Sequence, residues 1–277
     1  MKKSFLLMTA CIISMLACAQ ILEVKSIEQL SDASYEDARV VGVSPNGDYV
    51  LMSTGSYQGL KRYDIASNKM QTLSKAEGAG FDAQISKDGQ EIVFAETTRH
   101  ADHTSTIKYV RHNLTKKANK VMTDKSTAFA SIANSNVVLT NEGGTMYIHR
   151  NGKSIVVAPF GTEDKIYIWS SLSPDQSKIC YHLGGKGTYV CNLDGSNNQL
   201  VGRDLLCPQW YNNNIIIGTH ERDNGRFVTA AAIVAYNLDG AVQILTNNDM
   251  IATDPYAADG KIVFNTMDGK TYMMTVK

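Results

Sequence analysis

The chain repeats one short sequence phrase six times, and no other feature restricts its fold so strongly. Each copy is a turn-forming group followed by an apolar run. The four clearest copies are Ser44-Pro45-Asn46-Gly47 before Tyr49–Met52, Ser86-Lys87-Asp88-Gly89 before Ile92–Phe94, Ser173-Pro174-Asp175-Gln176 before Ile179–Tyr181, and Ala258-Asp259-Gly260 before Ile262–Phe264. Two weaker copies are Asn134-Ser135-Asn136 before Val137–Leu139, and Pro208–Asn214 before Ile215–Ile217.

The spacing of these copies predicts the architecture. They begin about every 38–47 residues, which is the length of one four-stranded propeller blade. Pro, Asn, Asp and Gly suit the tight turns between neighbouring antiparallel strands. No sustained helical periodicity follows the first residues of the chain. We therefore predict an all-β protein, a six-bladed β-propeller with four-stranded antiparallel blades.

The two ends of the propeller are predicted to share one blade. The last copy supplies only three strands, over Asp254–Ala258, Lys261–Thr266 and Thr271–Lys277. Ile21–Leu30 can supply the fourth, outer strand, which would close the ring and leave no long exposed edge. Residues 20–277 then form a single domain of six blades, with about 43 residues in each.

The repeat resembles that of the TolB-like propellers, whose Pro-Asp repeats are related to those of WD40 proteins. The matching pieces are Pro208-Gln209-Trp210, Ser173-Pro174-Asp175, Ile92-Val93-Phe94, and Asp239-Gly240 with Leu245-Thr246. The resemblance covers essentially residues 21–277 and concerns blade architecture. The TolB protein has an additional α/β domain before its propeller, for which this sequence leaves no room, so TolB's lipoprotein partner is not expected here.

The first nineteen residues predict export. Lys2 and Lys3 precede a short apolar run that ends at Ala17-Cys18-Ala19, the layout of a cleavable signal peptide. The run is shorter than the roughly 20 residues of a membrane-spanning helix. We expect a periplasmic or secreted protein with no transmembrane span after the signal is removed. In the alternative interpretation, Cys18 is lipidated and anchors a lipoprotein.

The charge of the remaining chain argues against a nucleic-acid partner. Removal of residues 1–19 takes away two lysines and no acidic residue, leaving 25 basic and 27 acidic residues. Nucleic-acid binding normally needs a concentrated basic surface. The length and the apolar content suit one globular unit, which we expect to be a monomer.

Two of the three remaining cysteines fall on adjacent predicted strands. Cys180 and Cys191 lie on either side of Gly184–Gly187. A two-residue turn at Gly185-Lys186 would place them opposite each other, where a disulfide can form in an oxidising compartment. The alternative is two small apolar residues packed side by side, and Cys207 is unpaired in either case.

One face of the predicted disc carries the longer loops and is our candidate site. These loops join the second and third strands of a blade, or one blade to the next, and loops held by a rigid scaffold often bind ligands. The candidate ligand-binding residues on this face are Arg99, His100, His103, Glu163, Asp164, His182, His220, Glu221, Arg222, Asp223 and Arg226. Histidine and carboxylate groups suit a divalent metal, and arginine suits an acidic or sugar ligand. The simpler interpretation, which we favour for each group, is a solvated loop or a strand-end histidine that is hydrogen-bonded within the protein.

No residue set in the sequence compels a catalytic interpretation. Our leading hypothesis is a non-enzymatic binding or scaffold module for a protein, peptide or glycan of the cell envelope. The alternative is a metal-assisted, polysaccharide-lyase-like or other carbohydrate-active enzyme that uses the channel mouth, for which His182, His220, His100 and His103 are the candidates. A serine peptidase is not expected, because no G-x-S-x-G motif is present. The sequence does not identify a cofactor or a metal.

Overall fold

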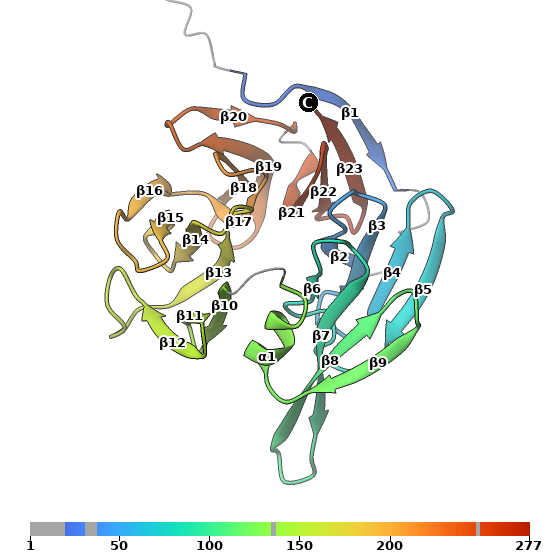
Figure 1. Cartoon of the computed structure of the whole chain (residues 1–277). Coiled ribbons are helices and arrows are strands. Elements are labelled where there is room, and N and C mark those ends of the chain that lie inside the picture. Colours follow the sequence, from blue (N-terminus) through green and yellow to red (C-terminus); the bar gives the residue numbers. More distant parts are fainter. Residues whose placement is uncertain (1–19, 31–37, 134–136, 248–249) are drawn as a thin grey trace, which may run out of the picture.

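Six antiparallel sheets are arranged as blades around a common centre (Figure 1). The computed structural model describes residues 20–30, 38–133, 137–247 and 250–277. The predicted six-bladed, all-β propeller is confirmed. The predicted signal peptide with Cys18, and the repeat copy at residues 134–136, lie outside the described residues. Within the described part of the chain, no helix is both long enough and apolar enough to cross a membrane.

The first three blades follow one another along the chain, and within each blade the strands run in sequence order from the inside of the ring outward. Blade 1 contains β2 (Ala38–Val43), β3 (Tyr49–Thr54), β4 (Leu60–Asp64) and β5 (Lys69–Ser74), and blade 2 contains β6 (Gln84–Ile85), β7 (Glu91–Arg99), β8 (Ser105–Asn113) and β9 (Ala118–Met122). Blade 3 follows helix α1 (Lys125–Ala130) and contains β10 (Val137–Glu142), β11 (Thr145–Arg150) and β12 (Lys153–Val157).

The other three blades complete the ring. Blade 4 contains β13 (Tyr167–Leu172), β14 (Lys178–Leu183), β15 (Gly187–Asn192) and β16 (Gln199–Gly202), and blade 5 contains β17 (Leu206–Trp210), β18 (Ile215–Asp223), β19 (Val228–Asn237) and β20 (Val242–Ile244). Blade 6 contains β21 (Ala252–Ala258), β22 (Lys261–Thr266), β23 (Thr271–Val276) and, as its outer strand, β1 (Val24–Gln29).

Blade 6 closes the ring in the predicted way. β1 pairs antiparallel with β23, with Val24 opposite Val276 and Gln29 opposite Tyr272. The segment before β1 is also bound to blade 5, because the Gln243 side chain accepts hydrogen bonds from two backbone N–H groups there and donates one to a carbonyl. Leu22 is buried in the apolar cluster between blades 5 and 6. The first and last strands are thus held together by pairing, polar contacts and packing.

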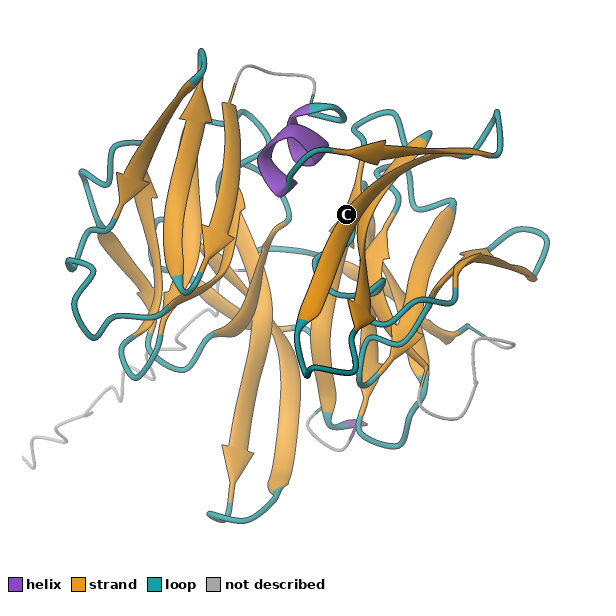
Figure 2. Cartoon of the chain, turned by 90° about the horizontal axis from the view of Figure 1, so that it is seen from below, coloured by secondary structure: helices purple, strands orange, loops and turns teal. Residues whose placement is uncertain are grey.

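Blade 3 departs from the predicted four strands. Its described residues form three strands, and α1 lies in the part of the chain where the other blades form the inner strand. α1 packs against β10 and also contacts β8 and β9. Figure 1 shows it between blades 2 and 3, and in Figure 2 it is the large purple helix at the top of the view. Asp124 caps α1, since its carboxylate accepts a hydrogen bond from the backbone N–H of Thr127 at 2.8 Å.

The repeated turn motif has a specific structural role. The Ser44 hydroxyl accepts hydrogen bonds from the backbone N–H groups of Asp48 and Tyr49. Ser173 makes the same contacts in blade 4. The third residue after the serine is left-handed in both turns: it is Gly47 in blade 1, with φ 67°, and Gln176 in blade 4, with φ 59°. Glycine adopts this conformation without strain, whereas another residue does so at a cost. The serine hydroxyl and the left-handed residue together fix the hairpin between the first and second strands.

The fifth residue of each second strand lies where neighbouring blades meet. In four blades this residue is polar and bonds to the backbone of the next blade. The contacts are Asn141 Nδ2 to Tyr167 O at 2.6 Å, His182 Nδ1 to Leu205 O at 3.1 Å, Asp254 N to Thr219 Oγ1 at 3.2 Å, and Val40 N to Asn265 Oδ1 at 2.9 Å. The equivalent residues of blades 1 and 2 are Ser53 and Ala95. Ser53 bonds within its own blade, to Gly59 O, and the alanine side chain has no hydrogen-bonding group.

The predicted cross-strand disulfide is not formed. The loop between β14 and β15 contains three residues instead of two, so Cys180 lies opposite Val190 and Cys191 opposite Ile179. Side chains of successive strand residues point to opposite faces of a sheet. The two sulfur atoms therefore enter different apolar clusters, and both cysteines are free and buried, which agrees with the alternative of apolar packing.

Candidate functional site

The inner strands carry a repeated backbone irregularity. Trp169, Cys207 and Asp254 have φ between 48° and 51°, and each lies in a β-bulge of the first strand of its blade. Asp82, with φ 54°, comes shortly before the inner strand of blade 2. A non-glycine residue in this conformation costs about 1–3 kcal/mol, and such strain concentrates at functional sites. The inner strands are therefore the candidate site.

Three of the inner strands are linked by a chain of polar contacts. The Cys207 thiol of blade 5 donates to Asp254 Oδ1 of blade 6 at 3.1 Å. Asp254 Oδ2 in turn lies 3.8 Å from a guanidinium nitrogen of Arg39 in blade 1. The Asp254 side chain is 31% exposed, so its carboxylate is in contact with solvent. The contacts fix one carboxylate where three blades meet.

A second carboxylate, Glu221, lies near this group. It is on β18, two residues beyond Thr219, and therefore on the side of the strand that faces blade 6. Burial raises the pKa of Glu221, and the negative charges of Asp254 and Asp223 raise it further. Two carboxyl groups in environments that differ in this way can divide the tasks of proton donor and charged partner.

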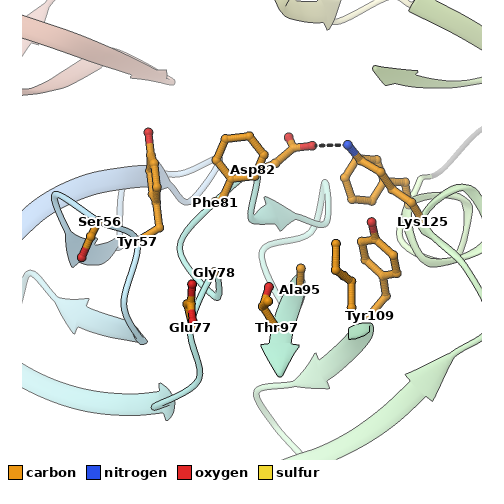
Figure 3. Close-up of a pocket in the computed structure, with 12 residues that line it drawn as sticks. Ser56, Tyr57, Glu77, Gly78, Phe81, Asp82, Ala95, Thr97, Tyr109 and Lys125 are labelled. Atoms are coloured by element: carbon orange, nitrogen blue, oxygen red, sulfur yellow. Dashed lines mark ion pairs between the residues drawn. The ribbon is translucent and has the colours of Figure 1, made fainter. Parts of the chain in front are cut away.

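A pocket with a volume of about 310 Å³ lies between blade 1, blade 2 and helix α1 (Figure 3). Its mouth carries Tyr57 and Phe81, whose rings meet edge to face with centroids 5.3 Å apart. Asp82 and Lys125 form an ion pair of 2.8 Å along the pocket. The pocket lies close to the carboxylate group, because Arg39, the partner of Asp254, lies beside Gly55, two residues before Tyr57. Burial raises the pKa of Tyr57, and the negative charge of Asp254 raises it further.

The two histidines predicted at the channel serve the framework. His182 is buried against Trp169 and bonds to the backbone of blade 5, as the fifth residue of its strand. His220 Nε2 lies 2.7 Å from the Tyr236 hydroxyl within blade 5. Burial lowers the pKa of both imidazoles, which favours their neutral forms.

The remaining predicted residues lie on exposed loops and do not converge. Arg99, His100 and His103 belong to the β7–β8 hairpin, which projects from the ring in Figure 1. There Arg99 pairs with Glu77 at the pocket, and His100 bonds to Thr106. Glu163 and Asp164 are exposed between β12 and β13. The exposed tip of the β18–β19 hairpin carries Arg222, Asp223 and Arg226.

Sequence reasoning found Glu221 but missed its partners. Arg39, Cys207 and Asp254 lie on inner strands, which the sequence identifies only as blade framework. Tyr57 and Phe81 lie in a second-to-third-strand loop and a blade-to-blade link, where aromatic residues were not considered, and Lys125 lies in the unpredicted helix α1. A signal existed, because Asp82 and Asp254 both lie at or just before the inner strand of a blade, and both have a positive φ, of 54° and 51°. An alignment of the six copies would have shown acidic residues at a position that is Cys207 or Trp169 elsewhere.

Comparisons with known proteins agree on the fold. No family model matches the chain, so the resemblance to TolB-like propellers stays a prediction, and no curated protein matches its sequence. Among solved structures, an oligogalacturonate lyase in complex with manganese is similar, with a TM-score of 0.53 and 14% identity over 85% of this chain and 76% of the lyase. An oligogalacturonate lyase from Vibrio parahaemolyticus has a TM-score of 0.53 and 13% identity over 84% and 76%.

The residues of this chain do not fit a manganese site. Among the described residues, no three His, Cys, Asp or Glu side chains are grouped so that they could share a metal ion. One imidazole nitrogen of His182 and one of His220 are already bonded within the protein. The metal ligands proposed from the sequence are therefore not brought together.

The leading functional hypothesis needs correction. It described a non-enzymatic binding or scaffold module, whereas both solved structures described above are oligogalacturonate lyases, which are enzymes. They agree better with the alternative drawn from the sequence than with a scaffold module.

Proposed function

We propose that this protein is a carbohydrate-active enzyme that cleaves glycosidic bonds at the mouth of its channel. The observation that carries the proposal is the pair of carboxyl groups formed by Glu221 and Asp254. The fold shared with oligogalacturonate lyases supports it independently of that pair.

Glu221 is suited to transfer a proton. Its raised pKa keeps the carboxyl group protonated to higher pH than an exposed glutamate, so it can donate a proton to a departing sugar oxygen. Asp254 is held by the Cys207 thiol and lies near Arg39, so its carboxylate has a fixed position. Pairs of carboxyl groups with different environments perform glycosidic bond cleavage in many enzymes.

Arg39 is the cation of this group. Its side chain is 55% exposed and its distance to Asp254 is 3.8 Å, so it can also reach a substrate. A guanidinium can bind a carboxylate or a ring hydroxyl of a sugar through two parallel hydrogen bonds. The group therefore combines a proton donor, a fixed carboxylate and a cation within one mouth.

The enzyme is proposed to work outside the cytoplasm, as a TolB-like propeller in the periplasm or after secretion. The pattern of residues 1–19 supports export. Mass spectrometry of the mature protein distinguishes cleavage after Ala19 from lipidation of Cys18, and an intact first residue Met1 would contradict both.

The test is an activity screen with matched variants. Purified protein is incubated with neutral and uronate-containing oligosaccharides, including oligogalacturonates. New reducing ends report any cleavage, and ultraviolet absorbance reports the double bond that only elimination creates. Glu221→Gln is expected to lower kcat by about 10²–10⁴, the usual contribution of general acid–base catalysis. Glu163→Gln, an exposed carboxylate on another loop, serves as the control. Equal rates in the two variants, or no cleavage by the wild type, would refute the proposal.

A further inference from the structure

The pocket exists because of the irregularity of blade 3. Ala95 is the one fifth residue of a second strand whose side chain has no polar atom, and it lines the pocket. Lys125 and Phe129 of α1 line the opposite side. A larger side chain at residue 95 would enter this space. The volume of about 310 Å³ is at the lower end of the range for small-molecule sites.

Three hydroxyl groups in the pocket are available to a ligand. Tyr57, Thr97 and Tyr109 line it, and none of their hydroxyls has a hydrogen-bond partner among residues 20–30, 38–133, 137–247 and 250–277. Figure 3 shows the rings of Tyr57 and Tyr109 on opposite sides of the space. A hydroxyl group both donates and accepts, so these three suit a molecule that itself carries several hydroxyls.

The charges of the pocket are already balanced. The Lys125 ammonium is bound to Asp82, and it also donates to Asn141 O. On the other side Glu77 is bound by Arg99. An anionic ligand would find no unpaired cation among the lining residues, so it would lose hydration without gaining an ion pair.

We propose that this pocket binds one neutral sugar residue, which extends the proposed function by naming a substrate unit. Its hydroxyls meet Tyr57, Thr97 and Tyr109, while its C–H surface packs on the Tyr57–Phe81 pair. The bound residue is part of the chain whose glycosidic bond reaches Glu221, because Arg39, the partner of Asp254, lies beside Gly55, next to the pocket residues Ser56 and Tyr57. A uronate is disfavoured here.

The test compares sugars that differ only at C6. Binding of galactose, glucose and mannose is measured by NMR titration, each against its uronate. At least one neutral sugar is expected to bind about tenfold more tightly than its uronate, since the acid would lose hydration without gaining an ion pair. Tyr109→Phe is expected to weaken this binding about threefold to tenfold through one lost hydrogen bond. Ala95→Leu is expected to abolish it by filling the pocket.

Tyr147→Phe is the matched control, because Tyr147 lies on β11 away from the pocket lining and its hydroxyl has no hydrogen-bond partner among the described residues. Unchanged thermal unfolding of each variant establishes that it is folded. Failure of all three neutral sugars to bind, tighter binding of a uronate, or equal loss in Tyr147→Phe would overturn the inference.

The two proposals fail separately. If cleavage depends on Glu221 but is unchanged in Ala95→Leu, the proposed enzymatic function stands and the proposed sugar subsite is wrong. If Ala95→Leu abolishes sugar binding but the wild type shows no cleavage, the subsite stands and the enzymatic function is wrong.

Discussion

Two junctions of the ring are built in opposite ways. Between blades 6 and 1, the Asn265 side chain bonds to both the N–H and the C=O of Val40, and the neighbouring apolar side chains are buried. Between blades 2 and 3, Ala95 makes no such bond, α1 replaces the inner strand, and a pocket remains. The comparison teaches that a repeat fold gains a binding site where one copy departs from the pattern.

Closure of the ring should be the most sensitive feature. Leu22→Asp places a carboxylate in the apolar cluster between blades 5 and 6, and should lower the free energy of unfolding by about 4 kcal/mol or more. Urea unfolding followed by circular dichroism measures it. The control is Ile244→Asp, because Ile244 on β20 is 61% exposed. Similar losses in the two variants would show that closure of blade 6 is not critical.

The second largest loss of stability should come from Asn265, whose side chain clamps blade 6 to blade 1. Asn265→Ala leaves a buried N–H and C=O of Val40 without partners and should cost about 2–3 kcal/mol. Ser53→Ala removes a side chain at the same position that bonds only within its own blade, and should cost about 1 kcal/mol. A loss from Ser53→Ala as large as that from Asn265→Ala would contradict the assignment of Asn265 as an interblade clamp.

A change at helix α1 should lower the free energy of unfolding less than a change at the clamped junction between blades 6 and 1. Asp124→Ala removes the cap of α1 and should cost about 1 kcal/mol at neutral pH. Hydrogen bonds from Thr127 and its neighbours hold the pKa of Asp124 far below its usual value. The carboxylate therefore stabilises the fold above the unfolded-state pKa, and the benefit disappears as the pH falls toward the folded-state pKa.

Unfolding midpoints at several pH values measure the effect of Asp124→Ala. Asp102→Ala is its control, because Asp102 makes comparable hydrogen bonds to Thr104 in an exposed hairpin tip that is not part of the ring. If the two variants have the same unfolding midpoint at each pH, the cap of α1 stabilises the protein no more than the hydrogen bonds of an exposed loop do.

The smallest effect should come from Glu221. Its pKa is raised in the folded protein, so the folded state holds the proton more tightly than the unfolded state. Stability is therefore lost as the pH rises from the unfolded-state pKa through the folded-state pKa. Glu221→Gln should remove this loss, so its unfolding midpoint relative to the wild type should be higher at pH 8 than at pH 4. A difference independent of pH would contradict the raised pKa of Glu221.

The sequence was sufficient for the regular parts of the molecule. The Ser44 and Gly47 turn is local, because its hydrogen bonds lie within six residues, and it therefore recurs visibly in the chain. The pairing of Ile21–Leu30 with the last strand could be inferred because the final copy lacked a strand. The ring and its closure follow from such local signals and from counting.

The site depends on contacts between distant residues. Asp254 meets Cys207 and Arg39 across 47 and 215 positions of sequence, and no spacing rule connects them. The cysteine prediction failed because one additional residue in the β14–β15 loop reverses which side chains share a face. Helix α1 was missed because it has only six residues, too few for a periodic pattern.

The partnership of β1 with β23 also has a consequence for how the molecule is made. Glu28 pairs with Met273, so strand β1 has no partner until nearly the whole polypeptide has left the ribosome. Such long-range pairing slows folding and leaves a strand edge open to the wrong partners in the meantime. During synthesis this chain should therefore depend on chaperones that cover unpaired strands, more than a helical bundle with local contacts would.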